Sequence, residues 1–114
     1  MPERVQLSRK AGWRMPPNTV RVARPGKWGN PITKQSFEDA QMLLQASGLP
    51  PLKGTWQQHA VKCYDAWLGG ELPEFGQPPT VEEIISELRG KNLACWCRPG
   101  TPCHADVLLE IANG

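Results

Sequence analysis

The chain has 114 residues, of which 39% are hydrophobic and 21% are charged, a composition that is ordinary for a globular protein. This length allows one compact domain, residues 1–114, and is too short for two domains with separate cores. No apolar run approaches the roughly 20 residues of a membrane helix, and the first residues lack the apolar core of a signal peptide. We therefore expect a cytoplasmic protein with no membrane partner, in which thiols stay reduced and clustered cysteines favour metal binding or catalysis over disulfides.

The net charge of +2 is unevenly distributed along the chain. Residues 1–34 contain eight of the thirteen basic residues and one acidic residue, a net charge of +7, whereas the other eighty residues have a net charge of −5. A basic segment that also contains Trp13 and Trp28 favours a nucleotide or a nucleic acid as partner. The alternative is that these bases pair with the acidic residues of the same domain.

Alternating and β-branched residues predict short strands at residues 5–7 and 19–23. A helix is expected over residues 36–46, with an apolar stripe formed by Phe37, Ala40, Leu43 and Leu44. Capping-box patterns, Thr55 with Gln58 and Thr80 with Glu83, predict the starts of a second helix and of a third helix over residues 81–89.

Residues 91–97 then predict a strand, and Cys103 and His104 open a last helix. The order of elements is strand, helices, strand, helix. It indicates an α/β or α+β fold, a single small domain with helices packed on a short sheet.

The ten residues from Cys95 to His104 contain three of the four cysteines and one of the two histidines. On a strand, Cys95 and Cys97 would share a face, and the following loop is long enough to return Cys103 and His104 to them. Such a set predicts a zinc site of the Cys3His kind, although the spacing is unusual and adjacent residues do not naturally point at one metal. An iron–sulfur cluster with Cys63 as fourth thiolate is a further alternative.

The same segment also supports a catalytic interpretation. A thiolate at Cys103 would be favoured by the unpaired N–H groups of a helix start, and His104 or Asp106 could carry a proton. In a purely structural interpretation, Cys95 is a small buried residue of the core, and His104 bonds a nearby carbonyl. All three interpretations stay open at the level of sequence.

The basic segment after the second strand is a candidate binding loop, because ligands of α/β sheets bind beyond the carboxyl ends of strands. The candidate ligand-binding residues are Arg21 in the strand and Arg24, Lys27, Trp28 and Asn30 in this loop. The arginines and the lysine could hold phosphate, the indole could stack on a base, and the amide could read a base edge. Alternatively, Trp28 fills the core and Asn30 makes a local turn bond.

Several segments together resemble a family known as the domain of unknown function numbered 4326, found in bacteria and phages. The resemblance is carried by residues 4–7, 12–14, 24–25, 27–31, 88–97 and 102–108. It implies one small intracellular domain whose shared residues are the basic loop and the cysteine segment. It implies no reaction.

These observations lead to three hypotheses. The first is a small domain that binds a nucleotide or nucleic acid. If this domain is an enzyme, hydrolysis or transfer on a nucleotide or nucleobase is the expected class of reaction. The second is a non-enzymatic zinc module that contacts another protein. The third is a phage accessory protein that binds a host factor and has merely structural cysteines.

Overall fold

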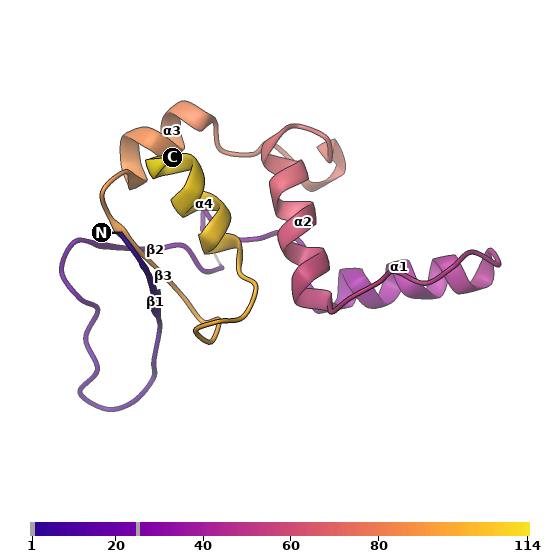
Figure 1. Ribbon diagram of the computed structural model, residues 1–114, viewed down its shortest axis with the longest axis horizontal. Helices are drawn as coiled ribbons and strands as arrows, with labels where there is room; N and C mark the ends of the chain where they lie inside the picture. Colours follow the sequence, from indigo (N-terminus) through magenta and orange to yellow (C-terminus); the bar gives the residue numbers. More distant parts are fainter. Residues whose placement is uncertain (1, 25) are drawn as a thin grey trace.

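The computed structural model describes residues 2–24 and 26–114 (Figure 1). Its elements, in chain order, are β1 (Arg4–Gln6), β2 (Thr19–Arg21), α1 (Lys34–Ala46), α2 (Trp56–Leu68), the 3-10 helix η1 (Pro73–Phe75), α3 (Val81–Leu88), β3 (Asn92–Cys95) and α4 (His104–Asn113). A parallel sheet of three strands, with helices between β2 and β3 in the sequence and a last helix after β3, confirms the predicted α/β class.

The three strands form one parallel sheet in the order β1-β3-β2. Val5 lies opposite Ala94 and Val20 lies opposite Leu93. The last strand in the sequence is therefore the central strand of the sheet. Because all three strands run the same way, their carboxyl ends meet at one edge, which we call the carboxyl edge.

The two faces of the sheet are covered differently. Leu93 and Cys95 of β3 belong to the main core, which also contains buried residues of α2, α3 and α4. Ala94 points to the other face, where a small cluster is completed by Trp13 from the long connection between β1 and β2. In Figure 1 this connection forms a wide loop away from the helices. The helices therefore pack on one face, and a loop supplies the cover of the other.

Capping boxes explain where α1, α2 and α3 begin. Both predicted capping boxes are present, with the Thr55 and Thr80 hydroxyls accepting from the backbone N–H groups of Gln58 and Glu83. Helix α1 begins two residues earlier than predicted, because Thr33 forms its own capping box with Ser36.

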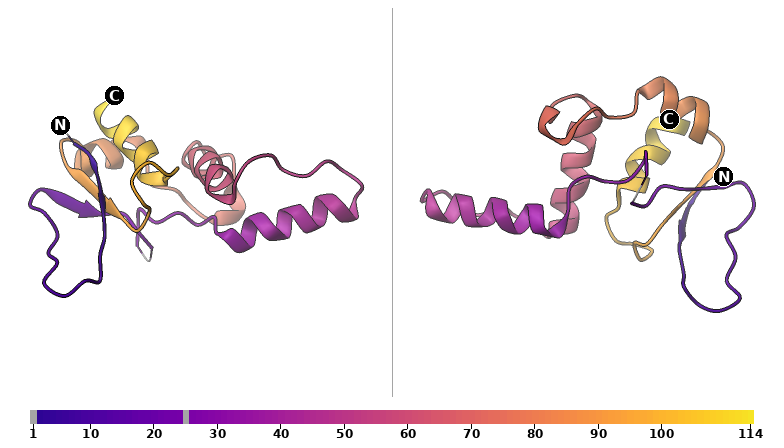
Figure 2. Two further views of the ribbon diagram at one scale, coloured as in Figure 1. Left: turned by 60° about the horizontal axis from the view of Figure 1, so that its bottom comes forward. Right: turned by 180° about the vertical axis from the view of Figure 1, so that it is seen from behind.

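The apolar stripe of α1 is left largely uncovered, and the strand predicted over residues 91–97 is shorter than expected. Helix α1 buries none of its residues, and Leu43 of the expected apolar stripe is 69% exposed. The reason is visible in Figures 1 and 2, where α1 extends away from the sheet and contacts the body of the molecule near the start of α2. Strand β3 ends at Cys95, since the chain bends at Trp96 and Cys97, so Cys97 lies just beyond the strand.

Within the described residues, no helix has the length and apolar character needed to cross a membrane.

Candidate functional site

A pocket of about 320 Å³ lies at the carboxyl edge of the sheet. Residues that follow β2 form one wall, the first half of α2 forms another, and the segment from Cys95 to His104 forms the third. This is the position at which open α/β sheets bind ligands. The volume is near the lower end of the range for small-molecule sites.

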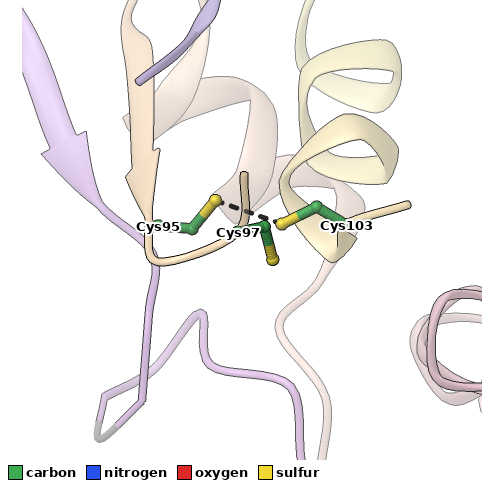
Figure 3. Close-up of side chains that lie close together, drawn as sticks. All are labelled: Cys95, Cys97 and Cys103. Carbon is green, nitrogen blue, oxygen red and sulfur yellow. Dashed lines mark hydrogen bonds between the residues drawn. The ribbon is translucent and has the colours of Figure 1, made fainter. Parts of the chain in front are cut away.

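Three cysteines converge on this pocket (Figure 3). Cys95 is the last residue of β3, and Cys103 is the N-cap of α4. Their Sγ atoms are 3.1 Å apart, and the sulfurs of Cys95, Cys97 and Cys103 all lie within 4.8 Å of one another. Cys95 and Cys103 are buried, whereas Cys97 is half-buried. The fold therefore brings together three thiols from a strand end, a bend and a helix start.

The turn between Cys97 and Cys103 is held by local and long-range bonds. Thr101 donates its backbone N–H and its hydroxyl to the carbonyl of Arg98, at 3.2 and 2.7 Å. Gly100 has a φ of +84°, a conformation that L side chains rarely adopt. These features reverse the chain between the end of β3 and the start of α4 and so carry Cys103 back to Cys95.

Arg4, on β1, forms hydrogen bonds that hold this turn in place. Its guanidinium donates to the carbonyls of Arg98 and Thr101, both at 2.7 Å, and to the Asp106 carboxylate at 2.8 Å. The Arg4 side chain is 11% exposed. Arg4 lies just before the strand predicted over residues 5–7, and the sequence contains no sign of this role, because its three partners lie more than ninety residues away.

The three thiols have unequal proton affinities. Hydrogen bonds from Cys103 and Cys95 lower the pKa of the Cys97 thiol, and the positive charge of Arg4 acts in the same direction. Hydrogen bonds to Cys95 and Cys97, together with burial, raise the pKa of Cys103. The cluster therefore favours one shared negative charge, located on the most accessible sulfur.

His104 is oriented by the backbone of the loop after β2. Its Nε2 lies 2.7 Å from the carbonyl of Val22. A carbonyl only accepts, so Nε2 carries the proton and Nδ1 keeps a free lone pair. Nδ1 lies 3.8 Å from the Cys103 sulfur, although His104 does not join the group of three sulfurs. Burial lowers the pKa of His104, which favours the neutral ring.

Asp106, the other predicted proton carrier, lies on α4 and binds Arg4. It lines a separate surface depression together with residues 99–102, and it does not line the pocket.

The predicted basic loop divides between the pocket and the core. Arg24 and Asn30 line the pocket, whereas Arg21, Lys27 and Trp28 do not. The side-chain amide of Asn30 is hydrogen-bonded within the protein. Its Nδ2 donates to the Ala60 carbonyl at 3.1 Å, and its Oδ1 accepts from the Ile32 N–H at 2.9 Å. Among the described residues that line the pocket, Arg24 is thus the one with a charged side chain.

The other three predicted ligand-binding residues have partners elsewhere. Lys27 forms ion pairs with Glu83 and Glu87 of α3 and lies 4.8 Å from the centroid of the Trp28 ring. Trp28 is 7% exposed and belongs to the main core. Arg21 donates to the backbone carbonyl of Arg24.

The pocket also contains aromatic residues that were not predicted as ligand-binding. Trp56 and Gln57 come from the first turn of α2, and Trp96 lies between two of the cysteines. An aromatic residue flanked by two cysteines beyond a strand is a signal in the sequence for Trp96. No comparable signal marks Trp56, since it is also an ordinary residue for the first turn of a helix.

The fold and the site define a class of protein: a small α/β domain whose parallel sheet presents three thiols to a pocket at its carboxyl edge. The chain belongs to the family described as a domain of unknown function, DUF4326, whose sequence model matches residues 5–114. No curated protein and no solved structure matches the chain.

Proposed function

We propose that Cys95, Cys97 and Cys103 bind a metal ion, with Zn²⁺ as the first candidate, at the wall of a pocket that binds a nucleotide. The observation that carries the proposal is the convergence of three sulfurs within 4.8 Å at the carboxyl edge. Thiolates select soft metals such as zinc or copper(I). In a tetrahedral site with Zn–S bonds of about 2.3 Å, the sulfurs are about 3.8 Å apart. This is longer than the 3.1 Å between the Cys95 and Cys103 sulfurs and shorter than the 4.8 Å within which all three lie.

Three protein ligands leave the fourth position of a tetrahedral metal open. Sites of this kind are typical of catalytic zinc, which holds water or substrate in that position. Because all three cysteines line the pocket, the open position would be accessible to a bound molecule. If the protein is an enzyme, hydrolysis or transfer on a nucleotide or nucleobase is the reaction class to test first.

The chemistry of the pocket supports a nucleotide as the ligand. Ala23, Ile32, Ala60 and Val61 provide apolar walls, and Trp56 adds an aromatic side chain. The Arg24 guanidinium forms no ion pair within the described residues, and it could pair with a phosphate. A flat base against the apolar walls and a phosphate at Arg24 would match this arrangement.

The metal part of the proposal is tested by elemental analysis of the purified protein. We expect about one zinc per chain, and we expect Cys97→Ser to abolish zinc binding because a hydroxyl is a poor ligand for this ion. Cys63→Ser is the matched control, since Cys63 lies on α2 outside the cluster. Metal-free protein that remains stable in chelator and has a fast-reacting cluster thiol would overturn the metal site and favour a nucleophilic cysteine.

The ligand part is tested by calorimetric titration of mononucleotides into the metal-loaded protein. Arg24→Gln should weaken binding, whereas Arg89→Gln, which removes the same charge at the C-cap of α3, should not. Absence of binding for every mononucleotide, or equal affinities for the wild type and Arg24→Gln, would overturn this part and leave the metal site standing.

One observation favours a second candidate function. The Nδ1 lone pair of His104 is 3.8 Å from the Cys103 sulfur, and its other nitrogen is anchored on a backbone carbonyl, as is common for metal-binding histidines. If His104 filled the fourth position, the site would be closed and structural, as in a zinc module that contacts another protein. Loss of zinc on His104→Ala would support this alternative, and retention of zinc would support the open site.

A further inference from the structure

We infer that the carboxyl edge binds single-stranded nucleic acid, one nucleotide of which enters the pocket beside the cysteine cluster. This inference rests on the proposed nucleotide pocket and extends it to a polymer. It is carried by three arginines and one exposed tryptophan that the topology places along a single edge.

The arginines occupy equivalent positions in the three strands. Arg9, Arg24 and Arg98 each lie three residues beyond the end of a strand, namely β1, β2 and β3. Because the strands are parallel and adjacent, these residues all emerge at the carboxyl edge. Neighbouring strands are about 4.8 Å apart, so the edge is about 10 Å wide and suits a few nucleotides.

Charge pairing within the protein leaves this edge positive. Of the eight basic residues in residues 1–34, Arg4 and Lys27 form ion pairs within the part of the chain that the structure describes. The remaining six, which include Arg9 and Arg24, form none there, and neither does Arg98. Pairing with acidic residues of the same domain, the alternative to a ligand, therefore explains only two of the eight basic residues in residues 1–34.

Trp96 connects the arginines with the pocket. It follows β3, the central strand, and is 43% exposed. The Arg9 guanidinium carbon lies 5.0 Å from the centroid of its ring, and Trp96 itself lines the pocket together with Arg24. Arg9, Trp96, the pocket and Arg24 therefore form one continuous surface.

This combination is the one that single strands require. Aromatic rings stack on unpaired bases of any sequence, and arginines follow the phosphates. A base in a duplex is already stacked and paired, so it must first be unstacked and extruded, at a cost in free energy, before it can lie on Trp96 or enter a pocket of about 320 Å³. No acidic residue lines the pocket in the described part of the chain, so nothing there repels a phosphate.

The test uses fluorescence anisotropy of labelled 12-mers of thymidine and of uridine, read at several salt concentrations. If the three arginines each contact a phosphate, log K should fall with log[salt] with a slope of about −2 for a single strand. Arg9→Gln and Arg98→Gln should each reduce that slope by about 0.7. Arg89→Gln, at the opposite edge near the start of β3, should leave the slope unchanged.

Trp96→Ala should weaken binding by about tenfold or more, and Trp96→Phe should recover much of the loss because a phenyl ring still stacks. The two oligomers distinguish DNA from RNA, and binding of either supports the inference. Equal affinities for a 12-mer and a mononucleotide would overturn it while leaving the proposed pocket intact. Preference for a duplex, or equal losses from Arg89→Gln and Arg9→Gln, would also overturn it.

Discussion

Two loops follow neighbouring strands of the same sheet and have similar compositions, yet their side chains are used differently. The β2 loop, residues 24 and 26–31, and the β3 loop, residues 96–103, both combine glycine, proline, tryptophan and basic residues. In the β2 loop, Trp28, Asn30 and Lys27 are all engaged by the protein itself. In the β3 loop, Trp96 stays 43% exposed, and the cysteines face a pocket.

The difference shows that a loop rich in polar and aromatic residues is not a ligand site by composition alone. What matters is whether the polar atoms are already satisfied. Both the nitrogen and the oxygen of the Asn30 side-chain amide have hydrogen-bond partners. Arg24, in the same loop, has a guanidinium with no ion pair within the described residues.

Trp28→Ala should lower the free energy of unfolding by about 3–5 kcal/mol, because it removes a large side chain from the main core. Urea denaturation measures the effect. Trp96→Ala is the control in the other loop and should change stability by no more than about 0.5 kcal/mol, as expected for an exposed position. The contrast fails if Trp28→Ala is as stable as the wild type.

Removal of the metal should lower the free energy of unfolding by about 3–4 kcal/mol if the ion is present at 100 to 1,000 times its dissociation constant. The physical reason is that the ion binds the folded cluster more tightly than the unfolded chain. Thermal unfolding with and without chelator measures the change. Cys97→Ser should make the protein insensitive to chelator, and a variant that still responded would contradict the assignment of this ligand.

Asn30→Ala should cost about 1–3 kcal/mol of stability, because the Ala60 carbonyl and the Ile32 N–H lose their partner in a buried place. Denaturant titration measures it. Gln57→Ala, a change in the same pocket, is the comparison and should be nearly neutral. A stable Asn30→Ala protein with impaired nucleotide binding would instead assign the amide to the ligand.

Arg4→Lys should weaken metal binding by about 10- to 100-fold, which is typical of residues that orient metal ligands. A lysine cannot bind two carbonyls and a carboxylate in the fixed geometry that Arg4 uses. Competition with a chromophoric chelator measures the affinity. Arg98→Lys keeps the carbonyl that Arg4 binds and should have no such effect, so an equal loss in both variants would exclude this positioning role.

Lys27→Met should have the smallest effect. The Lys27 ammonium is exposed and paired with Glu83 and Glu87 of α3, away from the pocket, and exposed pairs contribute little. Nucleotide affinity should be unchanged within error by calorimetry. A marked loss of affinity would show that Lys27 leaves these partners to reach the ligand, and the β2 loop would then be a binding loop.

The comparison also shows which parts of the fold could be predicted from the sequence. Capping boxes at Thr55 and Thr80 are local, since donor and acceptor are three residues apart, and both were predicted correctly. The exposure of Leu43 could not be predicted, because a helical stripe does not reveal whether another element will cover it.

The same distinction applies to the site. The convergence of Cys95, Cys97 and Cys103 was predicted because a short turn joins them. The partners of Lys27 and Arg4 were not, because they lie about sixty to one hundred residues away in the sequence. Residues close in sequence can be placed from local rules, whereas distant pairings depend on the assembled fold.

The central position of β3 has a consequence for the order of assembly during synthesis. The strands β1 and β2 are made first but do not pair with each other, since β3 lies between them. They must wait for a strand that begins at Asn92, and Cys103 follows later still. Because domains fold as units while their chains are synthesised, a nascent chain cannot bind metal in the native cluster before β3 and Cys103 have been translated.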